Sequence, residues 1–148
     1  MNLFNQAVSA SNNFEMTKTF VTNEIVNQCA EYIFGQKFED YIKGRLAGSA
    51  IEKRELTIYV SFWAYHSGCS TTNFTCGPWV WTNPEASHYS FDSREYKGVE
   101  LREIHINIVQ EMCNMVKARM QEFGFSNIRI INKINNLGYA EYEVITRW

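Results

Sequence analysis

The stretch 54–65, RELTIYVSFWAY, decides the fold, because apolar residues occupy every second position along it. A period of two is typical of a β-strand, whose successive side chains point to opposite faces of a sheet. The aliphatic positions, which we expect to face helices, are Leu56, Ile58, Val60, Phe62 and Ala64. The other face carries Tyr59, Trp63 and Tyr65, and such a ring-rich face either packs beneath residues 66–97 or contacts a partner. We expect the first arrangement.

A helical pattern precedes this strand. Residues 22–48 place apolar side chains three and four positions apart, which is the spacing of one helix face. Thr22 is the expected N-cap and Gly48 the expected end. Gly35 interrupts the pattern, so the segment forms either one kinked helix or two shorter helices.

The C-terminal part of the chain predicts a second long helix and a hairpin. Residues 99–123 have a helical apolar face, and Gly124 is the expected C-cap. That face comprises Ile104, Ile108, Met112, Val116, Met120 and Phe123. Two alternating segments, 127–134 and 139–148, then form the closing β-hairpin.

These elements predict an α+β fold in which two main helices pack on a largely antiparallel sheet as two layers. The expected order is helix, strand, irregular hairpin, helix, strand, strand. A chain of 148 residues fits one domain. Residues 1–13 are small and polar and are expected to form a loose N-terminal arm. Residues 14–148 form the single domain, with a long irregular insertion at 66–97.

Composition excludes several classes of protein. The formal net charge is −2, which argues against nucleic acid as the main partner. A local basic cluster exists at Lys43, Arg45, Lys53 and Arg54, but two glutamates interleave with it, and we interpret it as a solvated turn. No signal peptide or membrane span is evident, so we expect a cytoplasmic protein without a membrane partner.

Four residues of the insertion are candidate metal ligands. His66, Cys69, Cys76 and His88 have the side chains that zinc prefers. Their spacing matches no standard zinc finger, and the alternative is that the cysteines and histidines act independently. We expect no cofactor, with a zinc-stabilised module contacting nucleic acid through the basic turn as an alternative function.

A second alternative is a small Cys/His hydrolase. Cys69 or Cys76 would be the nucleophile, with His66 or His88 and Asp92 as its partners. No flanking signature accompanies these residues, so catalysis is the less favoured interpretation and we expect the protein not to be an enzyme.

Aromatic residues give the leading hypothesis for function. They gather in and beside the insertion and are mixed there with serine, threonine and asparagine, a composition typical of adaptable contact surfaces. Such a surface fits a protein partner or a nucleotide-like ligand whose base stacks on a ring. The alternative is a second small core; homo-oligomerisation is left open. The predicted binding residues are Trp63, Tyr65, Phe74, Trp79, Trp81, Tyr89, Phe91 and Tyr96.

The predicted second long helix ends at a Gly124-Phe125 step, and the chain closes with the segment YAEYEVITRW. In these features and in overall character the chain resembles small accessory proteins of bacteriophages and prophages. The resemblance implies a protein that acts without catalysis, by inhibiting a host defence protein or by sequestering a small signalling ligand.

Overall fold

The protein has the predicted α+β fold. The computed structural model describes residues 2–66, 72–76, 95–133 and 141–148. The helices are α1 (Leu3–Ile33), α2 (Gln36–Leu46), α3 (Ala50–Lys53) and α4 (Leu101–Glu122). The strands are β1 (Glu55–His66), β2 (Thr72–Cys76), β3 (Glu95–Tyr96), β4 (Val99–Glu100), β5 (Asn127–Ile131) and β6 (Glu141–Arg147).

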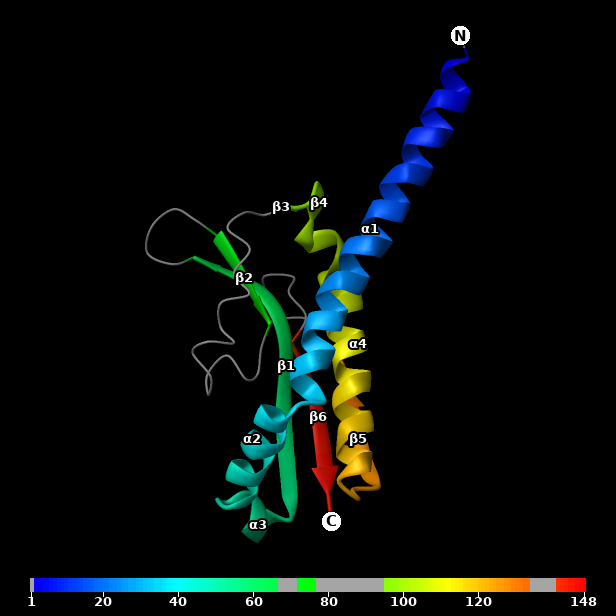
Figure 1. The fold of residues 1–148 in the computed structure, drawn as a ribbon. Helices are drawn as coiled ribbons and strands as arrows, with labels where there is room; N and C mark the ends of the chain where they lie inside the picture. The colour runs from blue at the N-terminus through cyan, green and yellow to red at the C-terminus, as the bar shows by residue number, and fades with distance from the viewer. Residues whose placement is uncertain (1, 67–71, 77–94, 134–140) are drawn as a thin grey trace.

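Four of the strands form one antiparallel sheet in the order β2-β1-β6-β5. Helices α1 and α4 lie side by side over this sheet, while α2 and α3 lie beside the first half of β1 (Figure 1). The last strand of the chain, β6, is therefore central. It pairs with β1 on one side and with β5 on the other.

The core lies between the sheet and the helices, where the alternation of β1 predicted it. Leu56, Ile58 and Val60 are buried, whereas Tyr59 between them is exposed. The predicted apolar face of the second long helix is confirmed, because its residues from Ile104 to Met120 are buried. The buried residues of α1 are Val21, Ile25, Cys29 and Ile33, and those of α2 are Phe38 and Ile42.

The first helix corrects the expected start of regular structure. Helix α1 begins at Leu3, so residues 3–13 are helical rather than a loose arm, and Thr22 is not an N-cap. The cap is Asn2, whose side-chain oxygen accepts a hydrogen bond from the Asn5 N–H at 3.1 Å. The Thr22 hydroxyl instead donates to the Lys18 carbonyl one turn earlier, as threonines inside helices commonly do.

The break near Gly35 separates two helices, which settles the alternative between one kinked helix and two. A Cβ at Gly35 would lie 2.9 Å from the Glu31 carbonyl oxygen, so the chain passes too close to the end of α1 for a side chain there. Helix α2 ends at Leu46, two residues before the expected stop at Gly48.

Gly124 ends α4 as predicted. Its φ of 101° is in the region that favours glycine. The Gly124 N–H donates to the Gln121 carbonyl at 3.0 Å, and the Phe125 N–H donates to the Met120 carbonyl at 3.1 Å. These two bonds form a Schellman motif, which satisfies carbonyls that the helix leaves unpaired.

Parts of the insertion 66–97 are strands, which corrects its description as irregular. His66 ends β1, and residues 72–76 form β2, which pairs with β1. The irregular hairpin expected within this insertion extends into residues 77–94, which lie outside the described residues, so it stays a prediction. Strands β3 and β4 form a tight hairpin turned by Lys97 and Gly98, both with positive φ.

Within the described part of the chain, none of the helices combines the length and the apolar character needed to cross a membrane.

Candidate binding site

The first half of β1 has an open edge. The Trp148 N–H donates to the Arg54 carbonyl at 3.1 Å, so even-numbered residues of this segment exchange hydrogen bonds with β6. The backbone groups of Glu55, Thr57 and Tyr59 therefore point away from β6. Strand β2 pairs with β1 only beyond this segment, and among the described residues no other strand pairs with its edge.

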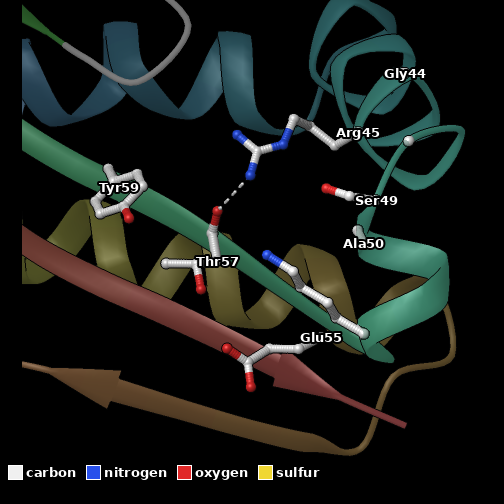
Figure 2. Close-up of a pocket in the computed structure, with 9 residues that line it drawn as sticks. Gly44, Arg45, Ser49, Ala50, Glu55, Thr57 and Tyr59 are labelled. Atoms are coloured by element: carbon white, nitrogen blue, oxygen red, sulfur yellow. Dashed lines mark hydrogen bonds between the residues drawn. The ribbon is translucent and has the colours of Figure 1, made fainter.

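A pocket of about 390 Å³ lies along this edge, between β1 and the α2–α3 segment (Figure 2). The strand side is lined by Glu55, Thr57 and Tyr59, which are the residues whose backbone faces the edge. The helix side is lined by Gly44, Arg45, Gly48, Ser49, Ala50 and Lys53. The turn between α2 and α3 thus brings two residues of the predicted basic cluster, Arg45 and Lys53, to the strand.

Arg45 connects the two sides of the pocket. Figure 2 shows its guanidinium reaching from α2 toward β1, where one Nη donates to the Thr57 carbonyl at 3.2 Å. The other Nη donates to the Tyr41 hydroxyl at 3.4 Å. A charged side chain on an unpaired strand edge protects that edge against pairing with other chains. Because the guanidinium has five N–H donors, further donors are left for a ligand.

The balance of charge in the pocket is positive. Arg45 and Lys53 line it, and neither forms an ion pair with any residue that the structure describes. The one carboxylate in the lining, Glu55, accepts a hydrogen bond from Arg147 Nε at 2.7 Å and is thereby compensated. The pocket therefore presents two cationic groups to a ligand, together with the Ser49 hydroxyl.

Gly44 leaves space in the pocket wall. A glycine inside a helix destabilises it by about 1 kcal/mol relative to alanine. A Cβ at Gly44 would meet nothing within 4 Å, so packing does not require a glycine there. The missing side chain instead widens the pocket, and we regard Gly44 as a functional candidate for that reason.

Tyr59 adds an accessible aromatic ring at the end of the pocket away from Glu55 (Figure 2). Its side chain lies on the outer face of the sheet and is 57% exposed. The expected cover of this aromatic face by residues 66–97 involves mostly residues outside the described part of the chain, so it stays a prediction. The ring is available to stack on a planar group of a ligand.

The structure brings only part of the predicted aromatic set into view. Trp63 and Tyr65 belong to β1, Phe74 to β2 and Tyr96 to β3. The register pairs Trp63 with Thr75, but Phe74 with Ala64, so Phe74 falls at a position of the opposite face. The other four predicted residues, Trp79, Trp81, Tyr89 and Phe91, lie outside the described residues. The aromatic surface as a whole stays a prediction.

The predicted zinc ligands are likewise only partly described. The register places His66 opposite Thr72 and Cys76 opposite Phe62, four residues apart along the strands. That offset separates the two residues by about 13 Å along the strands. Two side chains that share one zinc ion must instead each place a ligand atom about 2 Å from the metal. His66 and Cys76 are thus poorly placed to share one ion. Cys69 and His88 lie outside the described residues, as does Asp92 of the predicted hydrolase triad.

The described cysteines with placed side chains are Cys29 and Cys113, and both are buried. Burial raises the pKa of the Cys113 thiol from 9.0 to about 12, which keeps it protonated and unreactive near neutral pH. Within the described part of the chain, no three or more His, Cys, Asp or Glu residues are grouped to hold a metal ion.

Sequence reasoning missed this pocket. The charge pattern around its basic residues predicts a solvated turn, and Arg45 and Lys53 are exposed in agreement with it. The signals that could have found this pocket were the glycine within a predicted helix and the reversal that returns Lys53 toward the start of the strand.

No family model matches the chain, and no curated protein or solved structure is significantly similar to it.

Proposed function

We propose that the protein is a non-enzymatic binding protein that holds a phosphate-bearing, nucleotide-like small molecule in the pocket beside β1. The observation that carries this proposal is the convergence of Arg45 and Lys53 on one pocket, without an ionic partner among the described residues. Arginine binds phosphate through paired N–H donors, and lysine binds it as a point charge. Two such groups suit a ligand with more than one negative charge.

The remaining lining supports a nucleotide-like shape. The pocket of about 390 Å³ lies within the usual range for small-molecule sites. Tyr59 and Thr57 are two strand residues apart, about 6.6 Å, so a base stacked on the ring leaves its phosphates near the basic side chains. The edge N–H groups of β1 offer additional donors to a base or a phosphate.

A binding role rather than catalysis is supported by the state of the pocket's carboxylate. Glu55 is the acidic residue of the lining, and its ion pair with Arg147 occupies it. Sequestering a small signalling molecule would be one form of this function, and it is the form that the resemblance to phage accessory proteins implies.

The test is a calorimetric titration of the purified protein with nucleoside, nucleoside monophosphate, nucleoside triphosphate and cyclic dinucleotide. We expect the phosphate-bearing compounds to bind and the nucleosides to bind weakly or not at all. Arg45→Ala and Lys53→Ala should each lower the affinity about tenfold or more, since a hydrogen bond to a charged group contributes about 1.5–3 kcal/mol. Affinity should also fall as salt is raised.

Two further variants sharpen this test. Lys43→Ala removes a nearby lysine that pairs with Glu39 at 3.9 Å and does not line the pocket, so affinity should be unchanged. Gly44→Ala should stabilise α2 while narrowing the pocket, so the unfolding free energy should rise as ligand affinity falls. Equal binding by wild type, Arg45→Ala and Lys53→Ala would refute the proposed site.

A protein partner is the second candidate, favoured by the open edge of β1. An extended peptide could pair with the backbone of Thr57 and Tyr59, as in strand addition, if the Arg45 guanidinium released the Thr57 carbonyl. An acidic peptide would suit the same positive pocket. Native mass spectrometry of the protein isolated from its own host distinguishes the two, because a bound nucleotide and a bound protein differ in mass.

A further inference from the structure

The first part of α1 carries large apolar side chains that the rest of the described chain does not cover. Every residue from 2 to 17 is exposed, and the helix extends away from the body of the protein (Figure 1). The exposed fraction is 71% for Leu3, 73% for Phe4, 43% for Val8 and 44% for Phe14. We call residues 3–17 the arm.

The apolar face of the arm continues the face that α1 buries in the core. The arm's apolar side chains recur at 3 or 4, 7 or 8, and 14, which is the spacing of one helix face. The same spacing leads on to the buried residues Val21, Ile25 and Cys29. The Lys18–Glu103 ion pair, at 3.5 Å, marks the place where α1 reaches the body. One face of α1 is therefore buried in the core near its C-terminal end, whereas no described residue covers the same face along the arm.

A helix of this length needs such a cover. The arm has about four turns, and isolated helices of that length are marginal in water even with favourable sequences. Its serine and asparagine content lowers the helix propensity further. Packing against its apolar face would therefore stabilise the arm.

The charge of the arm points to a second copy of the chain. Residues 2–14 contain no Asp, Glu, Lys, Arg or His, so nothing on them repels a second copy. A helix that lies on a membrane surface is typically rich in Lys and Arg on its polar face, whereas the polar residues of 2–14 are Ser, Asn and Gln. A different protein partner is typically selected by complementary charges beside the apolar seam, and residues 2–14 have none there.

The size of the face is sufficient for a reversible dimer. At 1.5 Å per residue the arm is about 22 Å long. Burying its two phenylalanines, Leu3 and Val8 on each of two chains, with the flanking polar atoms, removes on the order of 1,000 Å² from water, near the lower limit for a specific interface.

We propose that two copies of the protein associate through their arms, with the Leu3/Phe4/Val8/Phe14 faces packed together. This association does not depend on the proposed ligand, because the arm and the α2–α3 pocket lie at opposite ends of the molecule (Figure 1).

Sedimentation equilibrium over a range of concentrations tests the proposal. Wild-type protein should reach twice the protomer mass at high concentration. Phe14→Glu should raise the dissociation constant at least tenfold, because it places a carboxylate in the packed face. The matched control is Met16→Glu. Met16 is 70% exposed on the opposite side of the helix, so the same change there should leave the dissociation constant unchanged.

Hydrogen–deuterium exchange provides a second readout that does not depend on a variant. Amides of the arm should exchange more slowly as concentration rises, while those of the core helix α4 should not change. A wild-type protein that stays monomeric at all accessible concentrations would overturn the proposal. Equal weakening by Phe14→Glu and Met16→Glu would overturn it as well.

Discussion

Arg45 illustrates which properties of a residue the sequence predicts, such as its exposure, and which depend on the fold, such as its hydrogen-bond partner. The mixed charge pattern around Lys53 and Arg54 correctly predicted that these two side chains are exposed. It could not show that Arg45 bonds the Thr57 carbonyl, because that contact depends on how α2, α3 and β1 meet. By contrast, burial of Leu56, Ile58 and Val60 could be predicted, since a strand's period of two fixes which side chains share a face.

Cys113 gives a residue-scale prediction about pH. Its pKa is raised by burial from 9.0 to about 12, so the unfolded chain loses this proton at a lower pH than the folded chain does. The contribution of this pKa shift to the unfolding free energy is fully present below pH 9 and is lost as pH rises toward 12. Unfolding free energy should therefore fall over that range, by up to about 4 kcal/mol from this group.

Urea unfolding of wild type and Cys113→Ala at a series of pH values measures this effect. Tyrosines and lysines titrate in the same range, so the difference between the two proteins is the relevant quantity. That difference should shrink as pH rises from 9 to 12. If it were independent of pH, the thiol would not have the raised pKa.

At the scale of elements, the sequence predicted β1 and α4 well and the start of α1 poorly. Residues 99–123 have an unbroken apolar face that tertiary packing uses, so their pattern was visible. Residues 3–13 contact little of the body and are rich in Ser and Asn, so neither propensity nor burial indicated a helix. The helical spacing of their apolar residues was the available signal for a helix, but the many polar residues between them made that spacing difficult to recognise.

A substitution at Gly124 tests how the end of α4 is stabilised. Gly124→Ala should lower the unfolding free energy by about 1–2 kcal/mol, because alanine is strained at a φ of 101°. A Cβ there would meet nothing within 4 Å, so the effect comes from the backbone alone. Gly44→Ala is the matched control, since it also has free space but lies inside a helix and should be stabilising. Urea unfolding that ranked both variants alike would contradict this account of the α4 terminus.

At the scale of the whole molecule, the two proposed surfaces lie at opposite ends. The arm of α1 extends from one end, and the pocket between β1 and α2–α3 lies at the other (Figure 1). The body between them holds the shared core, which separates association of the chain from ligand binding. Variants at one end are therefore expected to leave the other function intact.

The central claim is that the ligand binds at the open edge of β1. Backbone amide chemical shifts, recorded as a phosphate-bearing nucleotide is added, test this most directly, because they report where the ligand binds. The account predicts saturable shifts at Thr57, Tyr59 and residues 44–53, and Arg45→Ala should need about tenfold more nucleotide, or more, to reach the same shifts. Shifts confined to other parts of the chain, or no saturable shifts with any nucleotide that is tried, would contradict it.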